Sequence, residues 1–266
     1  MKEVGTLVPG SEEFKEAYPK SKRVNVLLLG VNEGMTDTIM LASFDTEQKR
    51  VDVISIPRDS YYERPDYPGP AHQKINSIYK DEGPEGTARA VSKILFGMPI
   101  HYYAVITDDG VAHVVDAMGG IEMDVPMDMK YDDPTQNLHI DLKAGPQVLN
   151  GGQAVQYLRF RKGYPTGDLG RVDAQQSFLK QAFDKTISLS FPKVAVAFIQ
   201  EVNTDIDLKM MIRLGKKAIG MGMEDFCAYT VSGVPQTING TSYYLVDEIG
   251  VKELVENIYN SENISE

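Results

Sequence analysis

Short apolar runs alternate with segments of helical periodicity along most of this chain, and that alternation is the feature that most limits its fold. Residues 24–30 are rich in Val and Leu and end in glycine, which indicates a buried strand. Helical spacing with apolar side chains on one face appears at 86–96 and again at 172–189. Strands that alternate with helices favour an α/β fold, and we expect a single α/β/α three-layer sandwich around a central mixed sheet. The other expected strands are 38–44, 51–57, 101–106, 121–125 and 226–231, and the other expected helices are 108–118, 151–160, 207–221 and 247–259.

The chain shows no repeats and no composition breaks, so we expect one domain at 23–266 after a polar lead-in at 1–22. Pro9, Gly10 and Pro19 interrupt the lead-in, which resembles neither a signal peptide nor a membrane anchor. No apolar run approaches the roughly 18 residues that are needed to span a bilayer.

The formal net charge is -11, from 27 Lys and Arg against 38 Asp and Glu. This balance argues against a sequence-independent nucleic-acid binder, which needs an excess of cations to displace counterions from phosphates. It also argues against simple adsorption to an anionic membrane. Any anionic ligand must therefore be captured by a local cluster of positive side chains.

Four of the nine arginines fall in two short stretches of the chain. Arg58 follows Pro57, which ends the third expected strand, so Arg58 projects at the carboxyl edge of the sheet, where open α/β sheets bind ligands. Arg159, Arg161 and Arg171 lie close together in sequence, and the first two point the same way only if the helix end has unwound. A guanidinium donates two parallel hydrogen bonds to phosphate and stays charged. Spacing alone favours the alternative, in which each arginine pairs with a neighbouring carboxylate.

Two turns after the first expected strand carry candidate oxygen ligands for a metal ion. The first turn contains Asn32 and Glu33, and the second, at 36–38, contains Asp37. Asp37 with Glu33 or Asn32 can serve Mg²⁺, which takes one or two carboxylates together with phosphate oxygens and waters. A capping or turn role for Asp37 explains the same residues. The turns match neither a dinucleotide-binding glycine fingerprint nor a Walker A loop.

Other catalytic chemistries find no support in the sequence. Cys227 is the single cysteine, which excludes an intrachain disulfide and a cysteine-based zinc site. The four histidines lack the spacing of a zinc-protease helix, and no nucleophile elbow of the GxSxG type is present. Serine or cysteine hydrolase chemistry is therefore not expected.

Eight short motifs that are weak singly become specific when they occur in order. They resemble the LytR-CpsA-Psr family of bacterial cell-envelope proteins over roughly residues 24–185. The motifs are VLLLG at 26–30, TDTIML at 36–41, SIPRD at 55–59, KIN at 74–76, DAMGGI at 116–121, LNGGQA at 149–154, YLRFR at 157–161 and DLGRVDAQ at 168–175.

The resemblance implies a phosphotransferase that moves a glycopolymer, such as teichoic acid or capsular polysaccharide, from a polyprenyl-pyrophosphate carrier to peptidoglycan. Its implied place is the extracytoplasmic face of a bacterial cell membrane of the Gram-positive type. Family members usually carry an N-terminal transmembrane helix, which we expect to be missing from this chain. The implied partners are the lipid-linked glycopolymer, the peptidoglycan acceptor and the membrane, with no nucleic acid.

The resemblance also implies roles for individual residues. The pyrophosphate would be bound by Arg58, Lys74, Arg159, Arg161, Arg171 and Gln175, and the catalytic set would be Arg58, Asp37, Asp59, Arg159 and Arg161. Mg²⁺ or Mn²⁺ would bind Asp37 and Asn32. Asp59 would orient an arginine. The prenyl tail would enter an apolar tunnel beside the helices at 86–96 and 172–189, whose apolar faces are equally explained as plain core.

Two positions depart from the family pattern, which usually has Asp at position 32 and Arg at position 35. Here these positions hold Asn32 and Met35. Asn brings an amide oxygen without charge, and Met removes one phosphate contact. The alternative hypothesis is therefore a non-catalytic protein that binds polyprenyl phosphate or a wall polymer.

Overall fold

The computed structural model describes residues 21–136, 138–188 and 197–260, and contacts among Cα atoms divide the chain into two compact units. Unit 1 comprises the chain up to Leu29, Glu33–Tyr103 and the chain from Cys227 on. Unit 2 comprises Gly30–Asn32 and Ala104–Phe226. Most of the expected lead-in at 1–22 lies outside the described residues.

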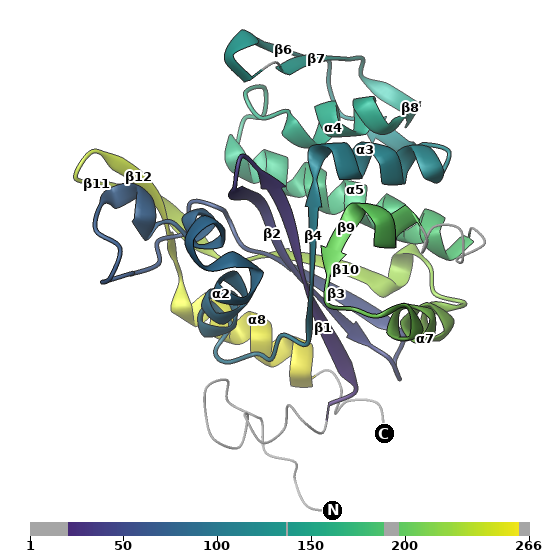
Figure 1. Cartoon of the computed structure of the whole chain (residues 1–266), viewed down its shortest axis with the longest axis horizontal. Coiled ribbons are helices and arrows are strands. Elements are labelled where there is room, and N and C mark those ends of the chain that lie inside the picture. The colour runs from purple at the N-terminus through teal and green to yellow at the C-terminus, as the bar shows by residue number, and fades with distance from the viewer. Residues whose placement is uncertain (1–20, 137, 189–196, 261–266) are drawn as a thin grey trace, which may run out of the picture. The chain divides into compact units, whose positions relative to one another are not determined.

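The observed elements confirm the α/β class (Figure 1). The first part of the chain forms β1 (Arg23–Asn32), β2 (Met35–Asp45), β3 (Arg50–Ser55), η2 (Pro70–Gln73), η3 (Ile75–Ser77) and α2 (Ile78–Ile94). The middle forms β4 (Tyr102–Thr107), α3 (Asp108–Ala117), β5 (Ile121–Val125), β6 (Met129–Asp133), η4 (Pro134–Gln136), β7 (Leu138–Leu142), β8 (Gly145–Leu149), α4 (Gly151–Arg159) and α5 (Asp168–Ser188). The last part forms β9 (Val202–Thr204), α7 (Leu208–Ala218), η5 (Met223–Asp225), β10 (Phe226–Thr230), β11 (Gly233–Ile238), β12 (Thr241–Val246) and α8 (Glu248–Asn260).

The largest sheet among the described residues has the strand order β10-β3-β2-β1-β4-β9 and is mixed, as expected. In β1, buried and half-buried residues alternate, and Leu27 and Leu29 have no more than 1% of their surface exposed. The alternation fits a strand whose two faces meet different surroundings. The other sheets are the two-stranded pairs β11-β12, β5-β8 and β6-β7.

The register between β2 and β3 determines which of their residues meet at the end of the sheet. The two strands are antiparallel, with Met40 opposite Ser55 and Asp45 opposite Arg50. Beyond the last of these pairs the Ile56 amide still donates to the Ile39 carbonyl oxygen over 2.9 Å. Continuing the same register by two residues brings 37 opposite 58.

The turn after β1 differs from its prediction. β1 runs to Asn32 and β2 begins at Met35, so only Glu33 and Gly34 connect them, with φ of 50° and 79°. Positive φ at both positions is the signature of a tight β-hairpin turn of type I′. The prediction that 36–38 forms a turn is wrong, because Asp37 lies within β2. Position 34 holds the usual glycine, but position 33 holds Glu where such a turn usually has Asn, Asp or Gly, so the sequence predicted this turn only weakly.

Two helices begin earlier than their periodicity suggested. α2 starts at Ile78 instead of 86, and Gly83, with φ of 66° and followed by Pro84, interrupts it. The polar residues before this kink hid the first turn. α5 starts at Asp168 instead of 172, and the apolar periodicity missed its first turn because that turn is largely polar and contains a glycine. The short strands β6 to β9, β11 and β12 were not predicted.

Close packing of α4 against α3 in unit 2 explains the first glycine of the LNGGQA motif, Gly151. Asn150 caps α4 by accepting from the Gln153 amide, and the Gln153 side chain accepts from the Asn150 amide. The Gly151 amide donates to Asp116 Oδ1 over 2.7 Å. A Cβ on Gly151 would lie 2.2 Å from the Ala112 carbonyl oxygen, so this position admits no side chain.

We therefore expect Gly151→Ala to lower the free energy of unfolding by about 2 kcal/mol, because it forces the α3–α4 contact apart. Gly152→Ala is the matched control, since a Cβ there meets nothing closer than 3.7 Å. The control should be neutral or raise stability by up to ~1 kcal/mol through helix propensity. Urea unfolding followed by circular dichroism measures both, and equal effects of the two changes would contradict the packing explanation.

Candidate functional site

Arg58 and Asp37 form an ion pair at the end of the β2–β3 pair in unit 1. The register brings the two residues opposite each other, and a turn closed by the Ser60 amide on the Pro57 carbonyl oxygen at 2.9 Å shapes the chain around Arg58. The Arg58 side chain is 20% exposed and the Asp37 side chain 35% exposed. The guanidinium is therefore oriented by a carboxylate and still partly open to solvent.

Asp59 and Lys74 form a second ion pair in unit 1, with 2.7 Å between the Lys74 Nζ and a carboxylate oxygen of Asp59. Backbone hydrogen bonds between 58–62 and 73–76 bring them together. The Ile75 amide donates to the Ser60 carbonyl oxygen over 2.9 Å, and the Asn76 amide donates to that of Arg58 over 3.2 Å. Asp59 was expected to orient an arginine, but its ionic partner among the described residues is Lys74.

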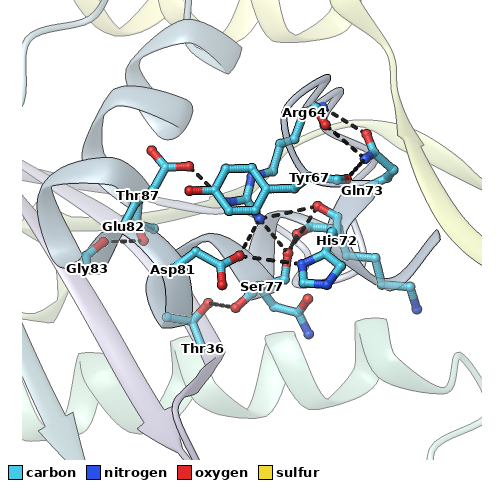
Figure 2. A network of polar contacts seen from close by, with 12 residues as sticks. Thr36, Arg64, Tyr67, His72, Gln73, Ser77, Asp81, Glu82, Gly83 and Thr87 are labelled. Atoms are coloured by element: carbon cyan, nitrogen blue, oxygen red, sulfur yellow. Dashed lines mark hydrogen bonds and ion pairs between the residues drawn. The ribbon is translucent and has the colours of Figure 1, made fainter. Parts of the chain in front are cut away.

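Arg64, which the sequence reasoning missed, ties the loop that carries these pairs to the start of α2 (Figure 2). Its guanidinium donates to Asp81 Oδ2 over 2.9 Å and to Glu82 Oε1 over 2.8 Å. It also lies 3.7 Å above the centre of the Tyr67 ring. Gln73 closes the same loop by accepting from the Arg64 amide at 2.8 Å and donating to the Tyr67 carbonyl oxygen at 2.8 Å. Because Gln73 adjoins Lys74, this network fixes the segment that presents the lysine.

Asp108 organises a second cluster, which lies in unit 2. Thr107 caps α3 by accepting from the Gly110 amide at 3.2 Å, so Asp108 takes the first position of the helix, where a negative charge is favoured. Its Oδ2 accepts from the Asn32 side-chain amide at 3.3 Å and lies 3.4 Å from a guanidinium nitrogen of Arg159. The sequence reasoning did not name Asp108 as a site residue. Its position directly after a strand, like that of Arg58, was the sequence signal that could have identified it.

The remaining predicted arginines differ in their surroundings. α4 ends at Arg159 and Phe160 is extended, with ψ of 130°, so the helix has unwound before Arg161. Arg161 is exposed and makes no ion pair with another described residue. Arg171, in the first turn of α5, is buried and pairs with Asp168 at 3.0 Å. Gln175, one turn further along α5, is only 6% exposed, and its side chain makes no hydrogen bond with another described residue.

The expected metal site has few protein ligands. Within 21–136, 138–188 and 197–260, no three His, Cys, Asp or Glu side chains converge as a metal cluster would. Asp37 supplies one carboxylate, and Asn32 uses its amide nitrogen toward Asp108, which leaves its oxygen for another partner. Mg²⁺ needs only one or two protein carboxylates when phosphate oxygens and waters complete its shell. Asp37 in unit 1 and Asn32 in unit 2 each offer at most one side-chain ligand, so phosphate oxygens and waters would have to complete the coordination of an ion at either residue.

The Arg64 network generates a stability prediction. Arg64→Ala leaves two carboxylates at the start of α2 without their buried cation, and we expect the free energy of unfolding to fall by about 3 kcal/mol. Arg89→Ala is the matched control, because Arg89 also pairs with Glu82, at 3.2 Å, but its side chain is 67% exposed. Removing that pair should cost less than about 1 kcal/mol. Chemical denaturation measures the free energy of unfolding of both variants. Equal losses in the two variants would contradict a stabilising role for the Arg64 network.

The stabilisation that the Arg64 network provides should depend on pH. Burial acts to raise the pKa of Asp81, but the hydrogen bond and positive charge of Arg64 outweigh burial and leave that pKa below its ordinary value. A carboxyl whose pKa is lowered by folding stabilises the protein above its unfolded pKa, and that stabilisation disappears as the pH falls through the folded pKa. The difference in free energy of unfolding between wild type and Arg64→Ala, measured by chemical denaturation, should therefore shrink as the pH is lowered below about 4.

Taken together, these clusters define a class: an α/β protein that presents oriented arginines and a lysine at strand and helix ends, as proteins that bind phosphate groups do. The LytR_cpsA_psr family model matches residues 8–260, and the chain belongs to this family. Among the described residues, no helix has the length and apolar character that crossing a membrane requires.

Several known proteins are similar to this chain. It is 29% identical to polyisoprenyl-teichoic acid–peptidoglycan teichoic acid transferase TagU of Oceanobacillus iheyensis over 252 residues. The matched region covers 89% of this chain and 75% of TagU. It is 27% identical to the enzyme of the same description, TagV, of Bacillus subtilis, spanning 88% of this chain but only 63% of TagV. The crystal structure of B. subtilis TagV superposes with a TM-score of 0.77, covering 91% of this chain and 97% of that one.

Proposed function

We propose that this protein transfers a glycopolymer of the teichoic acid or capsular type from a polyprenyl-pyrophosphate carrier to peptidoglycan, at the extracytoplasmic face of the cell membrane. Membership of the family and the transferase names of TagU and TagV support this function. The observation that carries it furthest is the Arg58–Asp37 pair, which holds a partly exposed guanidinium at the end of the sheet. An oriented guanidinium suits a pyrophosphate because its planar fork donates two parallel hydrogen bonds to phosphate oxygens and stays charged.

The reaction is a displacement at phosphorus. A sugar hydroxyl of peptidoglycan attacks the phosphorus that carries the glycan, the bond from this phosphorus to the bridging oxygen breaks, and polyprenyl phosphate leaves. The hydroxyl loses its proton, for which Asp37 or Asp59 is a candidate acceptor, although orienting a cation is the role we favour for each. Negative charge spreads over the phosphoryl oxygens in the transition state, so catalysis is chiefly electrostatic.

The chain's cations divide this work. Arg58, held by Asp37, donates to phosphate oxygens, and Lys74, held by Asp59, adds a point charge. Arg159, Arg161 and Arg171 bring further guanidinium groups, of which Arg161 is the most open to solvent. Gln175, one turn after Arg171 in α5, would supply a hydrogen bond to the pyrophosphate.

Mg²⁺ or Mn²⁺, when bound, would neutralise charge on the phosphoryl oxygens, with Asp37 and the amide oxygen of Asn32 as its protein ligands. Asn32 brings no charge of its own, and Met35 stands where the family pattern has an arginine. A charge-assisted hydrogen bond is worth about 1.5–3 kcal/mol, so the loss of one weakens substrate binding without abolishing it.

Arg58→Ala should abolish glycopolymer transfer while the fold remains intact, because the substitution removes the oriented phosphate donor but no core packing. Transfer to peptidoglycan is measured with a purified lipid-linked glycopolymer, and circular dichroism verifies the fold. Arg89→Ala, which removes an exposed arginine elsewhere in unit 1, should transfer at the wild-type rate. Wild-type transfer by Arg58→Ala would refute the assignment of this residue.

The second candidate function is a non-catalytic protein that binds polyprenyl phosphate or a wall polymer. Asn32 and Met35 are the observations that favour it, since both departures remove charge from the region that would serve metal and phosphate. The two functions share a ligand and differ in whether the carrier lipid is released.

A further inference from the structure

The outward surface of α7 in unit 2 combines cations with apolar side chains, and the transfer reaction uses none of them. Six exposed residues form what we call the basic face of α7: Leu208, Lys209, Ile212, Arg213, Lys216 and Lys217. At 100° per residue these positions cover one continuous half of the helix. Ile219, directly after the helix, is 63% exposed.

The opposite side of α7 carries the two buried residues of the helix. Met211 and Ala218 are buried, and Asp207 caps the helix by accepting from the Met210 amide at 2.7 Å. Neither the Asp207 cap nor the buried residues involve the basic face. Its sequence determines two different sides, one for packing within unit 2 and one for contact with something else.

The charge of the basic face is unusual for this chain. Four cations and no carboxylate occur in the 11 residues of α7, although the chain as a whole carries -11. None of these four cations forms an ion pair with another residue of the described ranges. A solvated helix face normally mixes both signs of charge, which stabilise each other at positions i and i+4.

We propose that α7 is a membrane-docking helix that lies on an anionic lipid bilayer. The cations reach lipid phosphates, while Leu208, Ile212 and Ile219 enter the boundary between headgroups and acyl chains. A soluble polyanion would attract the cations but would gain nothing from the exposed apolar side chains, so the combination favours a lipid surface. The attraction acts within about 8 Å at physiological ionic strength, so it is local and survives the acidic charge of the rest of the protein.

Vesicle co-sedimentation tests this proposal without any substrate, so its outcome is independent of the transferase function. The chain should bind vesicles that contain phosphatidylglycerol, with binding that weakens as salt is raised, and should bind pure phosphatidylcholine at least tenfold less. The variant Lys209→Gln, Arg213→Gln, Lys216→Gln, Lys217→Gln should lose at least tenfold in affinity for the anionic vesicles.

A matched control removes four exposed cations from other elements: Lys22→Gln, Lys49→Gln, Lys80→Gln and Lys130→Gln. Its net charge changes equally, so it should keep affinity within about twofold of the wild type. Equal losses in both quadruple variants, or wild-type binding by the α7 variant, would overturn the proposal. Circular dichroism verifies that both variants are folded.

A second variant separates a bilayer from a polyanion as the ligand. Leu208→Ser with Ile212→Ser keeps every cation but removes apolar side chains that are already exposed, so folding should be unaffected. Binding to anionic vesicles should fall severalfold if these side chains enter the bilayer. Unchanged vesicle binding by this variant would overturn membrane docking and leave simple attraction to anionic polymers.

Discussion

The antiparallel register between β2 and β3 is the constraint on which the unit 1 part of the candidate site depends. It brings Asp37 opposite Arg58, and the turn at Pro57 then directs the chain so that Asp59 meets Lys74. A slip of one residue would send every side chain of β2 to the other face and separate the pair. Arg64 adds a second constraint by fixing the loop that carries Asp59 and Lys74 to α2.

Local signals in the sequence were sufficient for part of this account. Pro57 marks the end of β3 and so predicts that Arg58 stands at the sheet edge, and Gly119–Gly120 mark the end of α3. The hairpin turn at Glu33 and the partners Arg64 and Asp108 were missed. Arg64 meets Asp81 across 17 residues and Asp108 meets Arg159 across 51, and no local periodicity reports pairings of that range. The site roles themselves rest on the family resemblance and remain predictions.

The structure shows the carboxylate pairing of the arginines, and their phosphate-binding role stays a prediction that this pairing does not conflict with. Arg58, Arg159 and Arg171 each pair with a carboxylate, as their spacing alone suggested, and each also stands where the family resemblance expects a phosphate ligand. Pairing orients a guanidinium, and an oriented guanidinium can donate two parallel hydrogen bonds to one phosphate group. The overall charge of -11 conceals this arrangement, as it conceals the basic face of α7.

The central claim is that these oriented cations serve transfer and not binding alone. Purified protein incubated with glycopolymer-linked polyprenyl pyrophosphate, Mg²⁺ and peptidoglycan, followed by mass spectrometry of the lipid, tests it most directly. The account predicts that polyprenyl monophosphate appears as peptidoglycan gains the phosphate-linked polymer. Recovery of the intact lipid-linked glycopolymer bound to the protein, with no polyprenyl monophosphate released, would contradict transfer and establish the binding protein instead.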